Sequence, residues 1–204
     1  MVKETTRIQR ANRELILAAA LPVFSADGFK GATVDRIAAA AGMSKPNLLY
    51  YFRRKDDIYA AVLERTLDAW LEPLEALNPA GEPELELARY IRIKLRMSLE
   101  APEASRLFAN EVLAGAPVIG DVLRGRLRRL VADKAGVIAG WMDAGRLHRM
   151  DPTHLIFMIW AMTQHYADFA VQVEAITGPA ADASGAAADT ILTLVLRGLR
   201  PGPA

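Results

Sequence analysis

One stretch constrains the fold more than any other part of the chain: residues 33–55, which read TVDRIAAAAGMSKPNLLYYFRRK. Thr33 is a favourable N-cap for a short helix, because its hydroxyl can accept a hydrogen bond from a free N–H of the first turn. Gly42 follows this helix at a position that often needs a left-handed backbone, which glycine adopts at little cost. Ser44 and Pro46 then suit the cap and the first turn of a second helix. The pattern predicts a helix-turn-helix, in which two short helices cross at roughly 90–120°.

The outward face of the second helix carries groups that suit base edges and phosphates: a cation, an amide, an apolar group and a phenol. They come from Lys45, Asn47, Leu49 and Tyr51. The residues expected in the angle between the two helices are apolar, namely Ile37, Ala38, Ala41, Met43 and Leu48. An ordinary helical hairpin with a solvated polar side is the alternative, so the spacing favours DNA binding without excluding that interpretation.

Residues at fixed spacings extend this pattern over about the first 60 residues of the chain. They are Gly28-Phe29, Thr33-Val34, Ile37-Ala38, Ala41-Gly42, Ser44-Lys45, Leu48 to Phe52, and Lys55. This set resembles the signature of the TetR family of one-component transcriptional regulators. The resemblance implies an all-α homodimer with about nine helices in each chain, a three-helix DNA-binding domain at residues 1–55, and a ligand-binding and dimerisation domain at residues 56–204.

The resemblance also implies a role for each residue of the DNA-binding surface, with double-stranded operator DNA as the partner. Phosphate contacts are expected from Thr33, Tyr51 and Lys55. The residues expected to face the major groove are Lys45, Pro46, Asn47 and Leu49, and Asn47 is expected to make a base hydrogen bond. Ser44 is expected to cap the helix, and Tyr50 is expected to pack behind it.

The charge distribution agrees with a DNA-binding domain joined to a helical body. Residues 1–60 carry ten Lys and Arg against six Asp and Glu, whereas the rest of the chain carries 15 against 18. A basic N-terminal part suits nucleic acid. Apolar residues make up 52% of the chain, with many Ala and Leu, which favours helices throughout.

The sequence contains no motif that indicates an enzyme. It has no cysteine, which excludes disulfides and thiolate metal sites. His148, His154 and His165 lack the HExxH spacing, and there is no phosphate-binding, dinucleotide-binding or Gly-x-Ser-x-Gly motif. We therefore expect no catalysis, no metal and no cofactor. The N-terminus lacks a signal-peptide core, and the longest apolar run, residues 155–162, is far shorter than the roughly 20 residues of a membrane span, so a cytoplasmic location is expected.

The other helices are predicted from apolar spacing and from breaks at proline and glycine. They are expected at residues 8–26, 54–77, 84–100, 102–114, 118–144, 151–176 and 186–199. Pro22 falls inside the first of these. An interior proline removes a hydrogen bond, so we expect a kink near Ala18, and we expect Leu15 to be buried on the apolar side of this helix.

The helices expected at residues 151–176 and 186–199 are apolar over more than one face and must be covered on several sides. A two-fold interface between two copies would cover them. Its residues would be Met158, Met162, His165, Phe169 and Val173 with Ile191, Leu194 and Val195. A wholly internal position in a monomer is the alternative. The family resemblance favours a homodimer, because two DNA-binding domains must be held about one turn of DNA apart, ~34–36 Å.

Several body segments resemble the pyrimidine-utilisation branch of the TetR family. They are Ala104–Phe108 with Glu111, Leu113–Pro117, Ile138–Trp141, His154–Ala161 and Thr163–Ala175. The resemblance implies a regulator that senses uracil or thymine and controls genes of pyrimidine catabolism. A TetR-type repressor that senses a drug, a fatty acyl group or a flavonoid-like aromatic compound is the alternative.

The residue chemistry is compatible with a small planar effector. Gln164 lies on the same helix face as Trp160, and its carboxamide can donate and accept at once, as an imide edge requires. Trp160 and Trp70 offer flat surfaces for a ring. The other expected ligand contacts are Phe108 and Glu111, which would accept a ring N–H, with Leu71 and Leu74 as the floor. Core packing of the tryptophans is the alternative interpretation.

Overall fold

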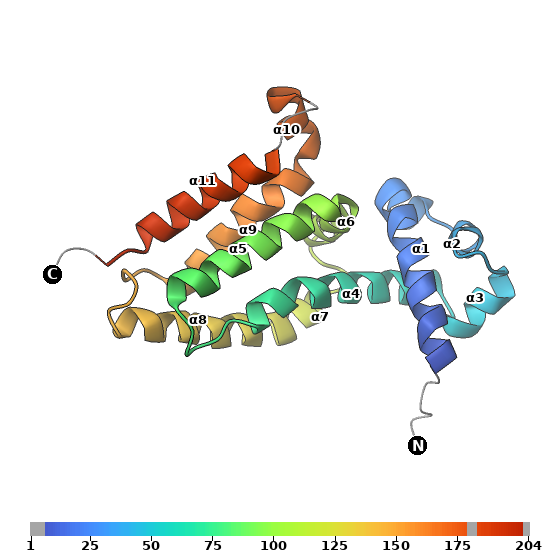
Figure 1. Ribbon diagram of the computed structural model, residues 1–204. Helices are drawn as coiled ribbons and strands as arrows, with labels where there is room; N and C mark the ends of the chain where they lie inside the picture. Colours follow the sequence, from blue (N-terminus) through green and yellow to red (C-terminus); the bar gives the residue numbers. More distant parts are fainter. Residues whose placement is uncertain (1–6, 179–182, 202–204) are drawn as a thin grey trace, which may run out of the picture. The chain divides into compact units, whose positions relative to one another are not determined.

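A computed structural model describes residues 7–178 and 183–201, and every regular element in these ranges is helical (Figure 1). The helices are α1 (Arg7–Gly31), α2 (Val34–Ala40), α3 (Lys45–Tyr51), α4 (Lys55–Glu75), α5 (Pro83–Glu100), α6 (Pro102–Leu113), α7 (Gly120–Val122), the π-helical segment η1 (Leu123–Leu127), α8 (Arg128–Asp143), α9 (Pro152–Asp168), α10 (Ala170–Thr177) and α11 (Ala183–Gly198). The all-α prediction is confirmed. Within the described residues, no helix is both long and apolar enough to cross a membrane.

The chain divides into two compact units, which we call the head unit and the body unit. The head unit comprises Met1–Leu67 with Arg106–Ile119, and the body unit comprises Asp68–Ser105 with Gly120–Ala204. Helices α4 and α6 therefore each contribute residues to both units. The domain boundary expected after residue 55 remains a prediction.

The head unit is built on apolar side chains from four helices. Ile16 and Phe24 of α1, Ile37 of α2, Leu48 of α3 and Ile58 of α4 are fully buried. The aromatic rings add specific contacts, since the centroid of the Tyr59 ring lies 5.0 Å from that of Phe24 and 4.9 Å from that of Phe29. This core fixes the short helices α2 and α3, which are too short to be stable alone.

Within α1, Gly28 has non-helical backbone angles, with a φ of 66° and a ψ of 173°. The kink expected near Ala18 from Pro22 stays a prediction, because the axis of a helix can bend at a proline while the backbone angles remain helical. Ala18 is exposed, so water can hydrate the carbonyl that Pro22 leaves without a donor. The expected burial of Leu15 is wrong, because this side chain is 49% exposed, while Leu17 is buried in its place.

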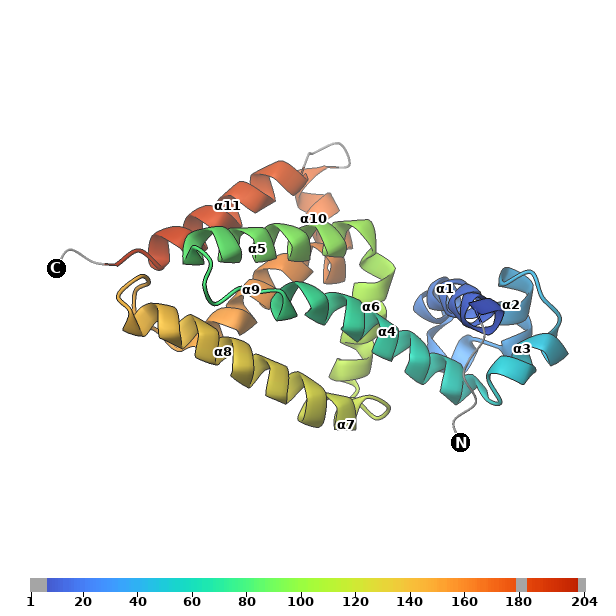
Figure 2. The ribbon, with the colours of Figure 1, turned by 60° about the horizontal axis from the view of Figure 1, so that its bottom comes forward.

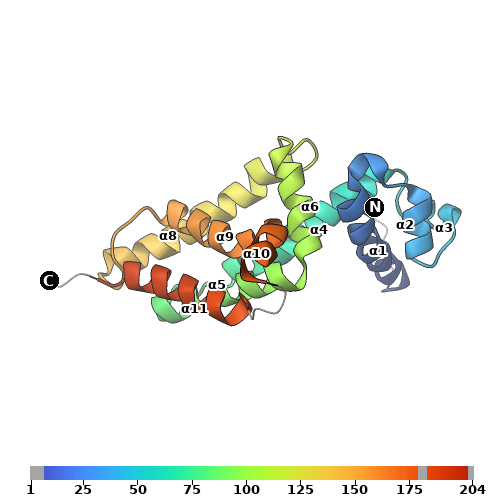
Figure 3. The same cartoon turned by 90° about the horizontal axis from the view of Figure 1, so that it is seen from above.

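In the body unit, α5 packs against both α9 and α11, and α9 also packs against α8 (Figures 2 and 3). The shared core includes Leu87 and Ile91 of α5, Ile138 of α8 and Ile159 of α9. Ile191 of α11 belongs to the same core.

One of the expected helices is interrupted. The segment expected as one helix at residues 118–144 is continuous from residue 120 as α7, η1 and α8, with helical backbone angles at the junctions Val122 and Arg128. The segment expected at 151–176 is divided at Phe169, whose φ of −115° and ψ of 31° are non-helical. This break contains no proline, and the apolar pattern continues across it, so the local sequence carries no signal for it.

Candidate DNA-binding surface and ligand pocket

The turn between α2 and α3 has the caps that the sequence predicts. The Thr33 hydroxyl accepts a hydrogen bond from the Arg36 N–H at 3.2 Å, and the Ser44 hydroxyl accepts one from the Asn47 N–H at 3.4 Å. Gly42 lies between the helices with a φ of 65°, in the left-handed region. These contacts are local, which explains why spacing alone was enough to predict this motif.

Helix α3 exposes the residues expected to face DNA. Lys45, Pro46 and Asn47 are exposed, Leu49 is half-buried, and Lys45 also donates to the exposed Asp35 carboxylate at 2.9 Å. The expectation that Tyr50 packs behind the helix is wrong, since its side chain is 70% exposed. The inner side of α3 is filled instead by Leu48 and by Phe52, which follows it.

Hydrogen bonds join the C-terminal end of α3 to α1. The Tyr51 hydroxyl accepts a hydrogen bond from the Asn12 amide at 2.7 Å, and the Tyr51 carbonyl accepts one from Arg13 at 3.0 Å. The Arg13 guanidinium also lies 4.2 Å from the centre of the Phe52 ring. The Tyr51 hydroxyl keeps its own proton to donate, so its expected phosphate contact is compatible with this arrangement.

Lys55, at the start of α4, is held by the C-terminal end of α1 and the residue that follows it. Its ammonium donates to the carbonyls of Phe29 at 2.6 Å and Ala32 at 2.8 Å, and lies 4.5 Å from the centre of the Phe29 ring. An ammonium has three N–H groups, so one remains for the predicted phosphate contact. The structure thus gives Lys55 a role in joining α1 to α4 that the sequence did not indicate.

The residues predicted to bind an effector are divided between the units. Phe108 and Glu111 are in the head unit, whereas Trp70, Leu71, Leu74, Trp160 and Gln164 are in the body unit. Trp160 is half-buried and donates from its indole N–H to the Tyr90 hydroxyl at 2.5 Å. Gln164 is half-buried, and Leu74 belongs to the apolar core of the body unit.

The carboxylate of Glu111 accepts hydrogen bonds from groups of the protein itself. One carboxylate oxygen accepts hydrogen bonds from the N–H groups of Val118 at 2.6 Å and Ile119 at 3.3 Å, and the other accepts one from the Tyr59 hydroxyl at 3.2 Å. Burial, together with the Glu111 charge, raises the pKa of Tyr59 to about 12. Both oxygens therefore have donors already, which differs from the ligand contact expected for this residue.

The body unit contains a buried polar cluster that the sequence did not predict. Lys94 of α5 is only 3% exposed, and its ammonium lies 4.6 Å from the centre of the Trp70 ring. Burial lowers the pKa of Lys94 to about 8, against an opposing attraction from Asp168. Ser105, which is fully buried, donates to one Asp168 oxygen at 2.5 Å. The available signal was a lysine on the apolar side of α5, one turn after the buried Ile91.

The body unit also contains an apolar pocket of about 380 Å³ beside Trp160. Its lining residues are Leu123, Leu127, Arg128, Val131, Ala132, Thr153, Phe157 and Trp160. Of the predicted effector residues, only Trp160 lines this pocket. Its volume lies within the roughly 300–1,000 Å³ range of small-molecule sites.

Two family patterns cover nearly the whole chain. Residues 16–62 match the pattern described as bacterial regulatory proteins, tetR family, and residues 63–202 match the YcdC-like protein, C-terminal region. The chain belongs to the TetR family. It is accordingly a DNA-binding transcriptional regulator and not an enzyme, and regulators of this family act as dimers that bind operator DNA and small effectors.

Individual relatives support this assignment over the body as well as the head. The chain is 47% identical over 199 residues to the HTH-type transcriptional regulator RutR of Escherichia coli K12, covering 96% of this chain and 94% of RutR. The structure of the transcriptional regulator SCO4942 from Streptomyces coelicolor is similar, with a TM-score of 0.74, 28% identity and coverage of 94% and 99% of the two chains. AibR, solved with isovaleryl coenzyme A and operator DNA, has the same fold, with a TM-score of 0.70, 17% identity and coverage of 90% and 97%.

Proposed function

We propose that this TetR-family protein is a repressor of pyrimidine catabolism genes and that uracil or thymine controls its affinity for operator DNA. The observation that carries the proposal is the extent of the similarity to RutR, which includes the body, where effectors bind. Body segments at residues 104–117, 138–141 and 154–175 resemble the pyrimidine-utilisation branch. Effector-binding bodies diverge more than DNA-binding heads in this family, so similarity in the body carries more information about the ligand.

The exposed face of α3 supplies the proposed operator contacts. Lys45 and Asn47 would reach base edges in the major groove, while Tyr51 and Lys55 would donate to phosphates. Each specific base contact is worth roughly 1–3 kcal/mol of discrimination.

The proposed effector lies in the body unit between aromatic and amide groups. Trp70 offers a ring face, and the half-buried Gln164 offers a donor and an acceptor for an imide edge. Trp160 is less free to contact a ligand through its N–H, because that group already donates to Tyr90. Its ring surface remains available to the proposed site.

Helix α4 provides the proposed link between effector and operator. It carries Trp70 in the body unit and begins at Lys55, which holds the end of α1. An effector that displaces Trp70 would move Lys55 and thereby the spacing of the two α3 helices. Coupling energies of this kind are typically 1–3 kcal/mol, or about a 5–150-fold change in operator affinity.

The proposed dimer interface is formed by apolar side chains that the protomer leaves exposed on α9 and α11, together with Phe169 between α9 and α10. Met158 is 55%, Phe169 55% and Leu194 63% exposed. His165 is also exposed, and its ring stacks on that of Phe169 with 5.0 Å between the ring centroids. Ile191 and Val195 are not suited to this role, because both are buried in the core of their own protomer.

The decisive experiment is operator release. A thermal-shift panel of pyrimidines and purines identifies the stabilising compound, which is then tested for release of operator DNA from wild type, Trp70→Phe and Gln164→Ala, with the exposed Gln172→Ala as the matched control. We expect uracil or thymine to release the wild type and the control at concentrations that leave the other two variants bound. Unchanged release from both site variants would contradict the proposed site.

A second candidate effector is a larger hydrophobic compound, which is favoured by the apolar pocket beside Trp160. A hydrophobic acid would suit this pocket, because the charged residue Arg128 lines it. Release of the operator by such an acid, with no response to pyrimidines, would favour this candidate.

A further inference from the structure

Lys94 is a buried cation, and none of the residues that the structure describes forms an ion pair with it. Its side chain is 3% exposed, and the contact that its ammonium makes is with the face of Trp70. Within the described part of the chain, no carboxylate lies within ion-pair distance of its ammonium, and the ammonium donates no hydrogen bond to another residue. Lysine is almost never fully buried unless it is paired, because desolvating the charge is costly. No fully enclosed side-chain nitrogen of the described residues lacks a hydrogen-bond partner, so the Lys94 ammonium is reachable from outside the protein, and water or a ligand can accept its N–H groups.

Asp168 supplies the complementary group within the same unit. It attracts Lys94 electrostatically from the C-terminal end of α9. Ser105 donates to its Oδ1 at 2.5 Å, which orients the carboxylate and leaves Oδ2 to accept another hydrogen bond. Asp168 lies one helical turn after Gln164, so the two side chains share a face of α9.

We propose that Lys94 and Asp168 are ligand-contacting residues that recognise a neutral cyclic imide, with Lys94 donating to a ring carbonyl and Asp168 accepting from the adjacent ring N–H. This inference rests on the proposed function and assigns the residues that determine its effector class. Trp70 borders the ligand beside Lys94, and Ser105 is a positioning residue that acts through Asp168.

The charges of the pair determine which ligands fit. One buried cation and one carboxylate balance, so a neutral ligand leaves the site without net charge. An added carboxylate on the ligand would leave a net negative charge in a desolvated site, which is unfavourable. A ring whose N–H groups are methylated would leave the Asp168 oxygen without a donor. Uracil and thymine therefore fit, whereas orotate and N,N′-dimethyluracil do not.

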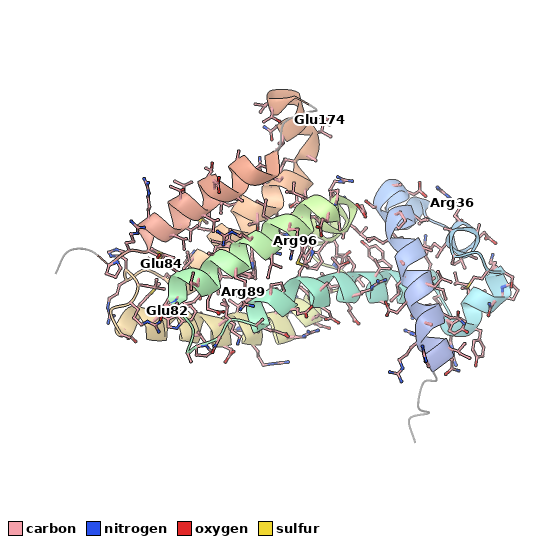
Figure 4. All side chains as sticks on the ribbon, viewed as in Figure 1. Arg36, Glu82, Glu84, Arg89, Arg96 and Glu174 are labelled. Carbon is pink, nitrogen blue, oxygen red and sulfur yellow. The ribbon has the colours of Figure 1, made fainter. Side chains whose placement is uncertain are left out.

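The test is calorimetric titration of uracil into the full-length protein without DNA, using wild type, Lys94→Met and Asp168→Asn. Methionine keeps the length of the side chain without its charge, and asparagine keeps an acceptor for Ser105. Arg96→Met is the matched control, because Arg96 is an exposed cation two residues further along α5 (Figure 4). Circular dichroism verifies that each variant is folded.

We expect both site variants to bind uracil roughly 10- to 100-fold more weakly than the wild type, as for the loss of a hydrogen bond to a charged group, and the control to bind normally. We also expect the wild type to bind neither orotate nor N,N′-dimethyluracil. Folded Lys94→Met and Asp168→Asn proteins that bind uracil as tightly as the wild type would overturn the assignment. A wild type that prefers orotate would overturn it as well.

Operator release separates this inference from the function on which it rests. A wild type that binds uracil through Lys94 and Asp168 but holds its operator unchanged supports the assignment and refutes the proposed regulation. Release by uracil that survives both substitutions refutes the assignment and supports the regulation. A wild type that binds no uracil and no other neutral imide refutes both.

Discussion

Replacing Lys94 with methionine should make the protein more stable, because the substitution removes a desolvated charge. The pKa of Lys94 falls from its ordinary 10.5 to about 8 in the folded protein. Each pKa unit corresponds to about 1.4 kcal/mol, so the protonated lysine costs the folded state about 3 kcal/mol at neutral pH. The attraction of Asp168, the charged group that acts on Lys94 from α9, is already included in this value.

The sign of the pH dependence follows from linkage. Between pH 8 and 10.5 the unfolded chain binds more protons at Lys94 than the folded one, so wild-type stability rises with pH across this window. The free-energy cost of burying the charged Lys94 applies in full below pH 8 and is absent above about pH 10.5. Methionine has no such dependence, so the gain from Lys94→Met should be largest at neutral pH and should shrink as the pH rises.

Urea denaturation at a fixed protein concentration measures this gain, because the apparent stability of a dimer depends on concentration. We expect Lys94→Met to be about 3 kcal/mol more stable than the wild type at pH 7 and to approach it at pH 10. Arg96→Met, which removes an exposed charge from the same helix, should change stability by less than about 0.5 kcal/mol. A Lys94→Met protein that is no more stable than the wild type at pH 7, or whose gain is the same at both pH values, would refute the reasoning.

Three further predictions concern other parts of the chain. Glu111→Gln should lower the pKa of Tyr59 from about 12 only part of the way to 10, since burial remains, as an NMR titration would detect; an unchanged pKa would show that the carboxylate has no influence. Asn47→Ala should weaken binding to the operator by roughly 1–3 kcal/mol while leaving non-specific DNA binding intact, and equal loss on both DNAs would contradict base recognition. Leu194→Glu should shift the protein towards monomers in sedimentation experiments, whereas an unchanged dimer would exclude the proposed interface.

The helix-turn-helix was predictable because its determinants are local. Thr33 and Ser44 cap helices within three residues of themselves, and Gly42 adopts the left-handed backbone that its position indicated. The exposure of Tyr50 was not predictable in the same way. Two neighbouring tyrosines, Tyr50 and Tyr51, have similar chemistry, and only the packing of α1 against α3 determines which one contacts Asn12.

The polar cluster of the body unit was not predictable, because its members come from four helices far apart in the sequence. Lys94 is on α5, Trp70 on α4, Ser105 on α6 and Asp168 on α9. The position of Lys94 one turn after Ile91 places it on the apolar side of α5, but this spacing does not identify the tryptophan that it contacts. Phe169, at which α9 ends, directly follows Asp168, whose hydrogen-bond partner Ser105 is distant in the sequence.

The cost of burying Lys94 has the magnitude that effector control requires. A ligand that accepts hydrogen bonds from this ammonium compensates its desolvation and so recovers part of the roughly 3 kcal/mol that the free protein lacks. This free energy is available only in conformations that keep Lys94, Trp70 and Asp168 around the ligand, so it stabilises those conformations over others. Typical couplings between effector and operator are 1–3 kcal/mol, and the recovered free energy falls in this range. Lys94→Met removes the desolvation cost of the buried charge, so the variant is stable in both conformations. Uracil then binds neither conformation in preference to the other, and we expect it no longer to change the affinity of the variant for operator DNA.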